Sequence, residues 1–550
     1  MTVDEARPSL RNVLFIMCDQ LRLDALSCHG GPIDTPNIDA LAARGVRFER
    51  AHVQGAVCGS SRMSFYTGRY VQSHGSRYNR IPLALDQRTI GDHLRSLGVP
   101  STLIGKTHMA ADTQSMEWLG LDPDAPEVMY LAECGFDPEE RDDGLQPGRG
   151  NAELPYNAFL RSHGYAGDNP WHTAANSVID DDGRRRSGWL LNASPYPAIV
   201  PDELSETAYM TDRAIDFVER AGDSRWCLHL SYIKPHWPYV VSAPFHDMVS
   251  PLDLPEPNRS DDEQLHDHPV LQAFWNSRIG RTFSRPEVRA AVAPAYFGLV
   301  KQLDHHLGRL FEVLDRTGRS EDTMIVFTSD HGDYLGDHWM GDKYWLHDEI
   351  VTVPMIVVDP RAEADPTRGS SSTALIEAID LAPTFVDALG GDPADHGLWL
   401  EGESLSPLLR GDRGPESDDI AICETDYAYV ELDLPSDPTL GRRNQRATML
   451  RTARFKYILD ETGPNLLYDL EDDPNELVDR IDDPALQAVR AELHERLFEW
   501  FRARSHETTG APLRWNGTVD DGDVAKSGVF IGYWDETEAA AVGALHHLED

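Results

Sequence analysis

A cysteine followed by small polar residues and an arginine is the first feature of the sequence that could do chemistry. Residues 57–69 read Val-Cys-Gly-Ser-Ser-Arg-Met-Ser-Phe-Tyr-Thr-Gly-Arg, with Cys58 at the expected start of a helix and Arg62 one turn further on. The start of a helix presents free backbone N–H groups and the positive end of the helix dipole, so it can bind a phosphate or a sulfate. Arg62 adds a fixed cation with a planar set of donors. We therefore expect Cys58 to lie in an anion-binding site.

Further polar side chains follow directly on four short runs that predict strands. These runs cover residues 13–17, 100–105, 226–233 and 323–328. In an open α/β sheet the functional crevice lies outside the carboxyl ends of the strands. We therefore expect the side chains that follow the four runs to meet at one edge of one sheet. They are Asp19 and Gln20, Lys106 and His108, Lys234 and His236, and Asp330 and His331.

Two of these strand ends carry donors that suit a divalent cation. A single Asp after a strand is more often a helix N-cap than a metal ligand, but here Asp330-His331 has a matching partner in Asp19-Gln20. Carboxylate and amide oxygens suit Ca²⁺ or Mn²⁺, and the imidazole makes Mn²⁺ or Zn²⁺ plausible as well. The sequence therefore predicts one metal site, with Ca²⁺ or Mn²⁺ as the favoured ions.

Lysine and histidine side chains recur with the same spacing around this predicted site. Taken one at a time, each is better explained as a solvated lysine or a hydrogen-bonded core histidine. Together with Arg62 and a metal, they describe a site for an oxyanion ester, in which cations neutralise developing charge. The chain has neither a Gly-x-Ser-x-Gly elbow nor a phosphate-binding P-loop. The residues of this cationic set are Lys106, His108, Lys234, His236 and Lys343.

Strand and helix patterns alternate over most of the chain, and this order predicts an α/β fold. Helical patterns cover residues 89–97, 206–221 and 284–316, and another strand is expected at 352–358. From about residue 410 the strand-like runs become shorter, and a helix is expected over 485–503, which indicates a smaller α+β subdomain. Residues 467–474 are rich in turn-forming residues and are expected to form a turn.

These patterns divide the chain into three parts. Residues 1–410 are expected to form the catalytic α/β domain, with a loop-rich insertion at 113–205 that shapes the pocket. Residues 411–505 are expected to form the α+β subdomain. The tail, 506–550, is rich in Gly and Asp and carries one apolar patch at 530–534, which predicts a contact between subunits of a homo-oligomer, a dimer or a tetramer.

Bulk composition excludes several classes of partner. The chain has 550 residues, 41% of them hydrophobic and 26% charged, with a formal net charge of −42. A phosphate backbone would be repelled by this charge, so we expect no nucleic-acid partner. Six scattered cysteines without a Cys-x-x-Cys pair suit reduced thiols, and no run reaches the length of a membrane span. With no basic, apolar leader at the N-terminus, these features predict a cytoplasmic protein without a membrane partner.

Taken together, these motifs resemble those of the type I sulfatases of the alkaline phosphatase superfamily, in which the signature cysteine is oxidised to formylglycine. The resemblance covers roughly residues 10–500 and implies an alkaline-phosphatase-like mixed sheet flanked by helices. Ser60 stands where the family usually has Pro or Ala, and Gln20 and His331 resemble the branch that contains phosphonate monoester hydrolases. Asn79 matches a substrate-contacting residue of that branch. The matching segments are Cys58-Gly-Ser-Ser-Arg62, Cys18-Asp19-Gln20, Gly105-Lys106-Thr107-His108, Lys234-Pro235-His236, Ser329-Asp330-His331-Gly332 and Leu467-Tyr468-Asp469-Leu470.

The resemblance also implies a mechanism. A hydrated formylglycine at position 58 would attack sulfur with one hydroxyl and expel sulfate with the other. Arg62 would hold the alkoxide, His236 would protonate the leaving alcohol and His108 would deprotonate the second hydroxyl, although these two histidine roles could be exchanged. The resemblance implies that the metal is held by Asp19, Gln20, Cys58, Asp330 and His331, and that the substrate is contacted by Asn79, Lys106, Lys234, His236 and Lys343.

The implied activity is hydrolysis of a small-molecule sulfate ester, aryl or alkyl/sugar, after modification by a formylglycine-generating enzyme. Lys106 and His108 match the sulfate-binding pair of true sulfatases. One alternative is a phosphonate monoester or phosphodiester hydrolase on the same scaffold. A second alternative, from a different class, is a binding protein that holds an anion with an unconverted Cys58.

Overall fold

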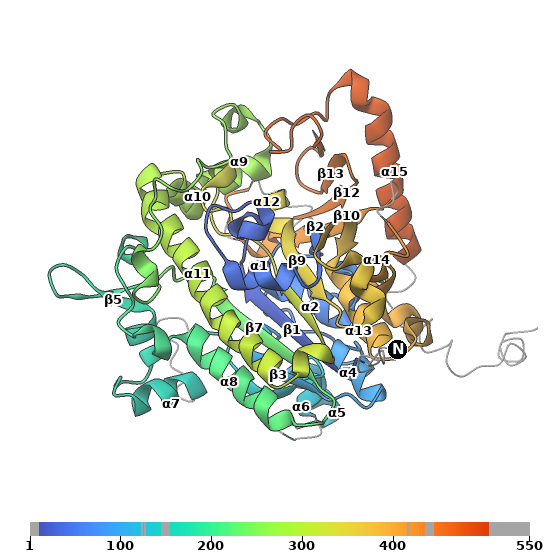
Figure 1. The fold of residues 1–550 in the computed structure, drawn as a ribbon. Helices are drawn as coiled ribbons and strands as arrows, with labels where there is room; N and C mark the ends of the chain where they lie inside the picture. Colours follow the sequence, from blue (N-terminus) through green and yellow to red (C-terminus); the bar gives the residue numbers. More distant parts are fainter. Residues whose placement is uncertain are drawn as a thin grey trace, which may run out of the picture. The chain divides into compact units, whose positions relative to one another are not determined.

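An eight-stranded mixed sheet forms the centre of the protein, with strand order β10-β2-β9-β8-β1-β7-β3-β4 (Figure 1). The computed structural model describes residues 10–122, 125, 128–144, 154–414, 419–430, 432–434 and 445–504. The described residues up to Arg502 belong to one compact unit. The strands are β1 (Asn12–Asp19), β2 (Val46–His52), β3 (Ser101–Gly105), β4 (Asp137–Arg141), β7 (Cys227–Pro235), β8 (Thr323–Ser329), β9 (Thr352–Val358) and β10 (Ser370–Glu377).

The four strands that carry the predicted site residues are neighbours and run in the same direction. β1 pairs in parallel with β8 on one side and β7 on the other, and β7 pairs in parallel with β3. Every residue of β1 is buried, as expected for a strand that is covered on both faces. Within this sheet, β9 runs against its neighbours β2 and β8. The predicted α/β class, with a mixed sheet flanked by helices, is therefore confirmed.

Helices cover both faces of the sheet, and alternate side chains of β1 point to the two layers. Phe15 and Met17 belong to a core shared with α2, α4 and α13, whereas Ile16 and Cys18 belong to a core shared with α1, α8 and α11. Figure 1 shows α8 and α11 crossing the strands β1 and β7. The helices of these layers are α1 (Pro36–Ala42), α2 (Cys58–Thr67), α4 (Ile90–Ser96), α8 (Glu206–Ala221), α11 (Pro286–Arg316) and α13 (Leu381–Ala388).

A second, antiparallel sheet carries the C-terminal part of the chain. Its strands are β11 (Ala421–Asp426), β12 (Arg446–Arg451), β13 (Phe455–Asp460) and β14 (Leu466–Asp469), and α15 (Gln487–Arg504) packs against it. The predicted turn at 467–474 is wrong in its first residues, because Leu467 to Asp469 pair with β13. Apolar side chains of this sheet belong to the same core as Phe15 and Met17 of β1. The predicted division of the chain at residue 410 stays a prediction.

The predicted insertion at 113–205 contains more regular structure than expected. It supplies β4, which pairs in parallel with β3 at the edge of the main sheet, and a hairpin of β5 (Ser177–Ile179) and β6 (Arg185–Ser187). Its helices are α5 (Thr113–Leu119), α6 (Met129–Ala132) and α7 (Pro155–Ser162). The remaining helices of the described chain are short: α3 (Val71–His74), α9 (Pro269–Asn276), α10 (Arg278–Phe283), α12 (Asp348–Val351) and α14 (Ser406–Arg410).

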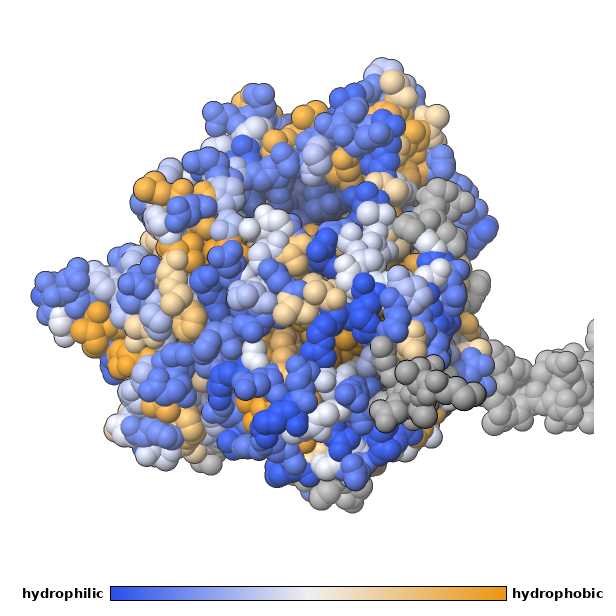
Figure 2. Space-filling view, viewed as in Figure 1, coloured by the Kyte–Doolittle hydropathy of each residue, from blue (hydrophilic) through white to orange (hydrophobic). Residues whose placement is uncertain are grey.

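The surface agrees with the strongly negative composition. Hydrophilic side chains dominate the face drawn in Figure 2, and apolar side chains form small separate groups on it. The six cysteines are free. Within the described ranges, no helix is both long enough and apolar enough to cross a bilayer. The apolar patch predicted at residues 530–534 lies outside the described residues.

Candidate active site

Cys58 is the first residue of α2 and is completely buried. The helix begins after an extended Val57, and all ten of its residues are buried. The backbone N–H of Gly59 donates to Asn79 Oδ1 at 2.8 Å. A Cβ on Gly59 would lie only 3.0 Å from Asn79 Cα, so this close approach requires glycine. Asn79, predicted to contact substrate, therefore also holds the start of the helix that presents Cys58.

Two strand ends place acidic and imidazole groups around the Cys58 sulfur. His331 Nε2 lies 3.1 Å from Cys58 Sγ, and the thiol donates to Asp19 Oδ1 at 3.6 Å. His331 Nε2 is also 3.8 Å from Asp19 Oδ1 and 3.7 Å from Asp330 Oδ1. One donor atom from each of these four buried residues lies within 4.8 Å of the others. The site thus gathers two carboxylates, one imidazole and one sulfur at a single point.

This donor set fits a divalent cation. Carboxylate oxygens and an imidazole nitrogen are ordinary ligands for Mn²⁺ or Zn²⁺, and the oxygens also suit Ca²⁺. The Cys58 sulfur is the fourth donor atom of the group. Gln20, the fifth predicted ligand, lies beside the group, and its Oε1 accepts a hydrogen bond from Lys343 Nζ at 3.0 Å.

Arg62 joins the two carboxylates of the site. Its Nε donates to Asp330 Oδ2 at 2.7 Å and its Nη2 donates to Asp19 Oδ2 at 3.3 Å. Its Nη1 donates to the backbone oxygen of Lys106 and to Ser231 Oγ. The guanidinium is fully buried, and its contacts hold carboxylates in place. The role that the resemblance implies for Arg62, holding an alkoxide at position 58, stays a prediction.

Two lysines place positive charge on the sulfur and its neighbours. Lys343 Nζ lies 3.2 Å from Cys58 Sγ, and Lys106 Nζ donates to Asp19 Oδ2. Burial raises the pKa of the Cys58 thiol, but Lys106, Lys343 and His331 outweigh burial and hold that pKa well below its ordinary value. An anion at position 58 is therefore favoured, as the activation of a nucleophile requires.

His108 and His236 approach the sulfur from two further strand ends. His108 is among the groups that lower the pKa of the Cys58 thiol, and burial and Lys343 lower the pKa of His236. The backbone N–H of His108 donates to Asp143 Oδ1 at 2.8 Å, and His236 Nδ1 pairs with the backbone oxygen of Trp237 at 2.6 Å. Hydrogen bonds therefore fix the backbone of His108 and the ring of His236.

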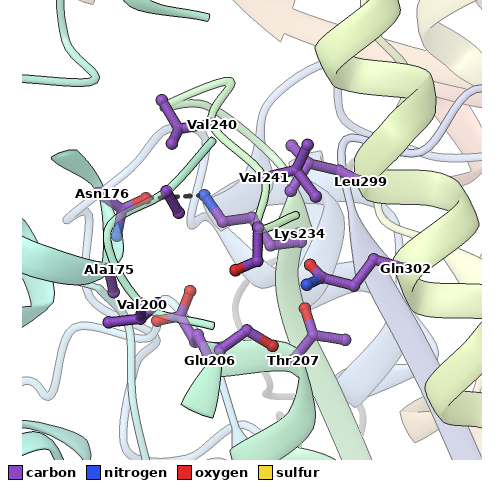
Figure 3. A pocket seen from close by; sticks show the side chains of 13 residues that line it. Ala175, Asn176, Val200, Glu206, Thr207, Lys234, Val240, Val241, Leu299 and Gln302 are labelled. Atoms are coloured by element: carbon purple, nitrogen blue, oxygen red, sulfur yellow. Dashed lines mark hydrogen bonds between the residues drawn. The ribbon is translucent and has the colours of Figure 1, made fainter. Parts of the chain in front are cut away.

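Lys234 differs from the other predicted cations because its ammonium is held elsewhere. Its Nζ donates to Asn176 Oδ1 and to the backbone oxygen of Pro238, both at 3.0 Å. Figure 3 shows this side chain pointing to Asn176 across a small cavity that Glu206 and Gln302 also line. Burial lowers the pKa of Lys234 to about 8, although Glu206 and Asp19 act in the opposite direction. Lys234 therefore contributes positive potential near Asp19 from a neighbouring cavity.

Two residues of the site were not assigned from the sequence. Asp333 Oδ2 accepts hydrogen bonds from Gln20 Nε2 and from Tyr239 OH, each at 2.5 Å. The Gln20 amide is thereby turned so that its oxygen faces Lys343. Burial and Asp342 raise the pKa of Asp333 to about 6. The run Asp330-His331-Gly332-Asp333 was a signal for Asp333, whereas nothing in the sequence pattern pointed to Tyr239.

Two family profiles and several known proteins match this chain. The profile of the family described as Sulfatase matches residues 11–391, and the profile described as N-sulphoglucosamine sulphohydrolase, C-terminal, matches residues 336–503. The multifunctional alkaline phosphatase superfamily protein PehA of Trinickia caryophylli is 29% identical, covering 90% of this chain and 96% of its own length. An arylsulfatase of Clostridium perfringens is 26% identical, covering 86% and 90%. A phosphonate monoester hydrolase from Silicibacter pomeroyi superposes with a TM-score of 0.75 at 30% identity, covering 90% and 96%.

Proposed function

Because the chain belongs to the sulfatase family, we propose that it hydrolyses a sulfate ester with formylglycine made from Cys58 as its nucleophile. A formylglycine-generating enzyme would carry out the conversion. Asp19, Gln20, Asp330 and His331, with residue 58 itself, would hold one divalent cation, Ca²⁺ or Mn²⁺. The observation that carries this proposal is the burial of Cys58 at a helix start between carboxylates, an imidazole and two lysines.

Each group around residue 58 has a separate role in the proposed reaction. When bound, the cation supplies a Lewis acid for a sulfate oxygen and lowers the pKa of a hydroxyl at position 58. When formed and hydrated, formylglycine would supply one hydroxyl for attack on sulfur and a second whose deprotonation re-forms the aldehyde and releases sulfate. Lys343 and Lys106 neutralise charge on the sulfuryl oxygens. His236 gives a proton to the leaving alcohol and His108 takes one from residue 58, or these two roles are exchanged.

A second candidate function is hydrolysis of a phosphonate monoester. Two solved phosphonate monoester hydrolases share a TM-score of 0.75 with this chain, at 30% and 28% identity. The arylsulfatase of Clostridium perfringens is 26% identical. The same cations and metal ligands would also stabilise a phosphonate. The similarity to the two phosphonate monoester hydrolases therefore supports this second candidate.

Mass spectrometry of the tryptic peptide 51–62 tests the nucleophile. Conversion of Cys58 makes the peptide lighter and reactive toward aldehyde reagents. A purified, fully active protein in which this peptide still carries an unmodified cysteine would contradict the proposal. An unconverted Cys58 in an inactive protein that binds sulfate would instead support the anion-binding alternative.

Paired substrates with the same leaving group separate the two hydrolase functions. We expect 4-nitrophenyl sulfate to be turned over with a higher kcat/KM than 4-nitrophenyl phenylphosphonate. The Cys58→Ala variant should lose turnover of both substrates while its melting temperature and metal content stay close to those of the wild type. A higher kcat/KM on the phosphonate would favour the second candidate function.

A further inference from the structure

A cavity of about 240 Å³ opens beside Lys343, the lysine that contacts Cys58. Lys343 lines this cavity, and its Nζ is 3.2 Å from Cys58 Sγ, so the cavity and the reactive centre share one side chain. Tyr78 also lines it, and the next residue, Asn79, holds the backbone of Gly59. Two separate segments thus connect the cavity to the start of α2.

Tyrosine rings form one wall of this cavity. The ring of Tyr78 is stacked against Tyr429, with centroids 5.2 Å apart and planes inclined by 22°. Tyr78 is also stacked against Tyr344, with centroids 6.5 Å apart and planes inclined by 19°. Phe274 and Met340 add further apolar surface. Tyr429 is half exposed, at 50%, so part of its ring is free to contact another ring.

The loop that carries Lys343 and Tyr344 is held in an unusual backbone conformation. Tyr344 has a φ of 100°, which an aromatic residue rarely adopts, and Asp342 has a φ of 63° in the left-handed region. The hydroxyl of Tyr344 donates to Asp342 Oδ2 at 3.2 Å, and Thr425 Oγ1 donates to the backbone oxygen of Tyr344 at 2.8 Å. These bonds fix the direction of the ring relative to the ammonium of Lys343.

The chemistry of the lining distinguishes between classes of leaving group. A sugar is normally bound by carboxylate and amide side chains, and none belongs to the described residues that line this cavity. A cavity of about 150 Å³ is enough to bind benzene, so about 240 Å³ accommodates one aromatic ring. Tyrosine faces bind another ring by offset stacking.

We propose that this cavity receives the alcohol part of the ester and selects an aryl group, with Tyr78, Tyr344 and Tyr429 as its recognition surface. This inference rests on the proposed function, since it assumes that the ester is cleaved at residue 58. It also assigns a role to the C-terminal part of the chain, because Tyr429 follows β11. The segment that follows β11 therefore contributes to substrate selection.

Binding of two small sulfonates tests the proposal without turnover. Isothermal titration calorimetry on the metal-loaded protein compares benzenesulfonate, which carries a ring, with methanesulfonate, which does not. We expect benzenesulfonate to bind at least about tenfold more tightly. Tyr429→Ala should lower the affinity for benzenesulfonate by about fivefold. It should lower the affinity for methanesulfonate less, because only benzenesulfonate loses a stacked ring.

A conservative variant at Tyr429 and a variant outside the cavity serve as controls for this test. Tyr429→Phe keeps the ring and should recover most of the lost affinity for benzenesulfonate. Trp118→Ala removes an aromatic side chain that is 84% exposed and does not line the cavity, and should change neither affinity. Equal affinities of the two sulfonates, or equal losses of both in Tyr429→Ala, would overturn the proposal. If the protein shows this selectivity but hydrolyses no sulfate or phosphonate ester, the aryl site stands and the proposed function fails.

Discussion

At the scale of single residues, the site depends on the balance of charge around Cys58. Arg62, Lys106 and Lys343 face the carboxylates of Asp19 and Asp330 and the sulfur itself. Removal of one partner from such a buried set leaves another charge uncompensated, which costs more than the interaction contributes on its own. Single substitutions here should therefore have large and specific effects.

Asp330→Asn tests the metal site. Asp330 Oδ1 accepts from the backbone of Gln20 and Oδ2 accepts from Arg62, so the amide keeps the size of the side chain but removes its charge. We expect affinity for the divalent cation to fall by about 100-fold or more. Elemental analysis after dialysis measures the loss, and Glu363→Gln on the surface is the matched control. A variant with wild-type metal content would rule out Asp330 as a ligand.

The pH dependence of activity tests Lys234. Its pKa is lowered to about 8, so the ammonium is present below pH 8 and is lost as the pH rises through that value. We expect kcat/KM to fall on the alkaline side near pH 8. Lys234→Met should be slower at neutral pH and should lack this alkaline decrease. An unchanged decrease in the variant would assign it to another group.

At the scale of secondary-structure elements, a buried lysine ties the C-terminal sheet to the main domain. Lys456 of β13 is fully buried, and its Nζ contacts Asp348 Oδ1 at 2.5 Å and Glu476 Oε1 at 2.6 Å. Lys456→Met would leave the buried Glu476 without its cation, at a cost of about 3–5 kcal/mol. Thermal or urea unfolding measures this loss, and Lys301→Met, a half-buried lysine on α11, should change stability by less than about 0.5 kcal/mol.

Some strands could be predicted from the sequence pattern and others could not. Strands buried on both faces, such as β1, appear as continuous apolar runs and were found. β2 (Val46–His52) and β10 (Ser370–Glu377) were missed because charged or small polar residues interrupt their patterns, and only pairing within the sheet makes them strands. β14 was assigned to a turn because its short apolar run leads directly into the turn-forming residues 469–474.

The site shows the same limit at the level of side chains. The carboxyl ends of parallel strands must meet, so the sequence could predict that Asp19, Lys106, Lys234 and Asp330 come together. It could not predict that Arg62 turns to the carboxylates or that Lys234 turns to Asn176, because those directions depend on neighbours that are distant in the chain. Tyr429 had no signal at all, since its proposed role depends on contacts with segments far away in the sequence.

At the scale of the whole molecule, the core continues across the predicted boundary at residue 410. Cys423, Met449 and Ile458 of the C-terminal sheet share one apolar cluster with Phe15 and other residues of the main sheet. A chain that ends at residue 410 would expose this surface to water. We expect residues 1–410, produced alone, to aggregate or to bind a hydrophobic dye, as measured by light scattering and fluorescence. A monodisperse fragment with a cooperative melting transition would show that the two parts fold independently.

The complete burial of α2 has a consequence for the timing of protein maturation. Cys58 has no exposed surface, and its neighbours on both sides are equally enclosed. The enzyme that the proposed function requires could not reach this side chain in the folded protein. Under the proposed function, conversion of Cys58 would therefore have to precede folding, and a recombinant host would have to supply the converting enzyme during translation. Purified unconverted protein should stay unconverted when this enzyme is added, and should become a substrate only after denaturation.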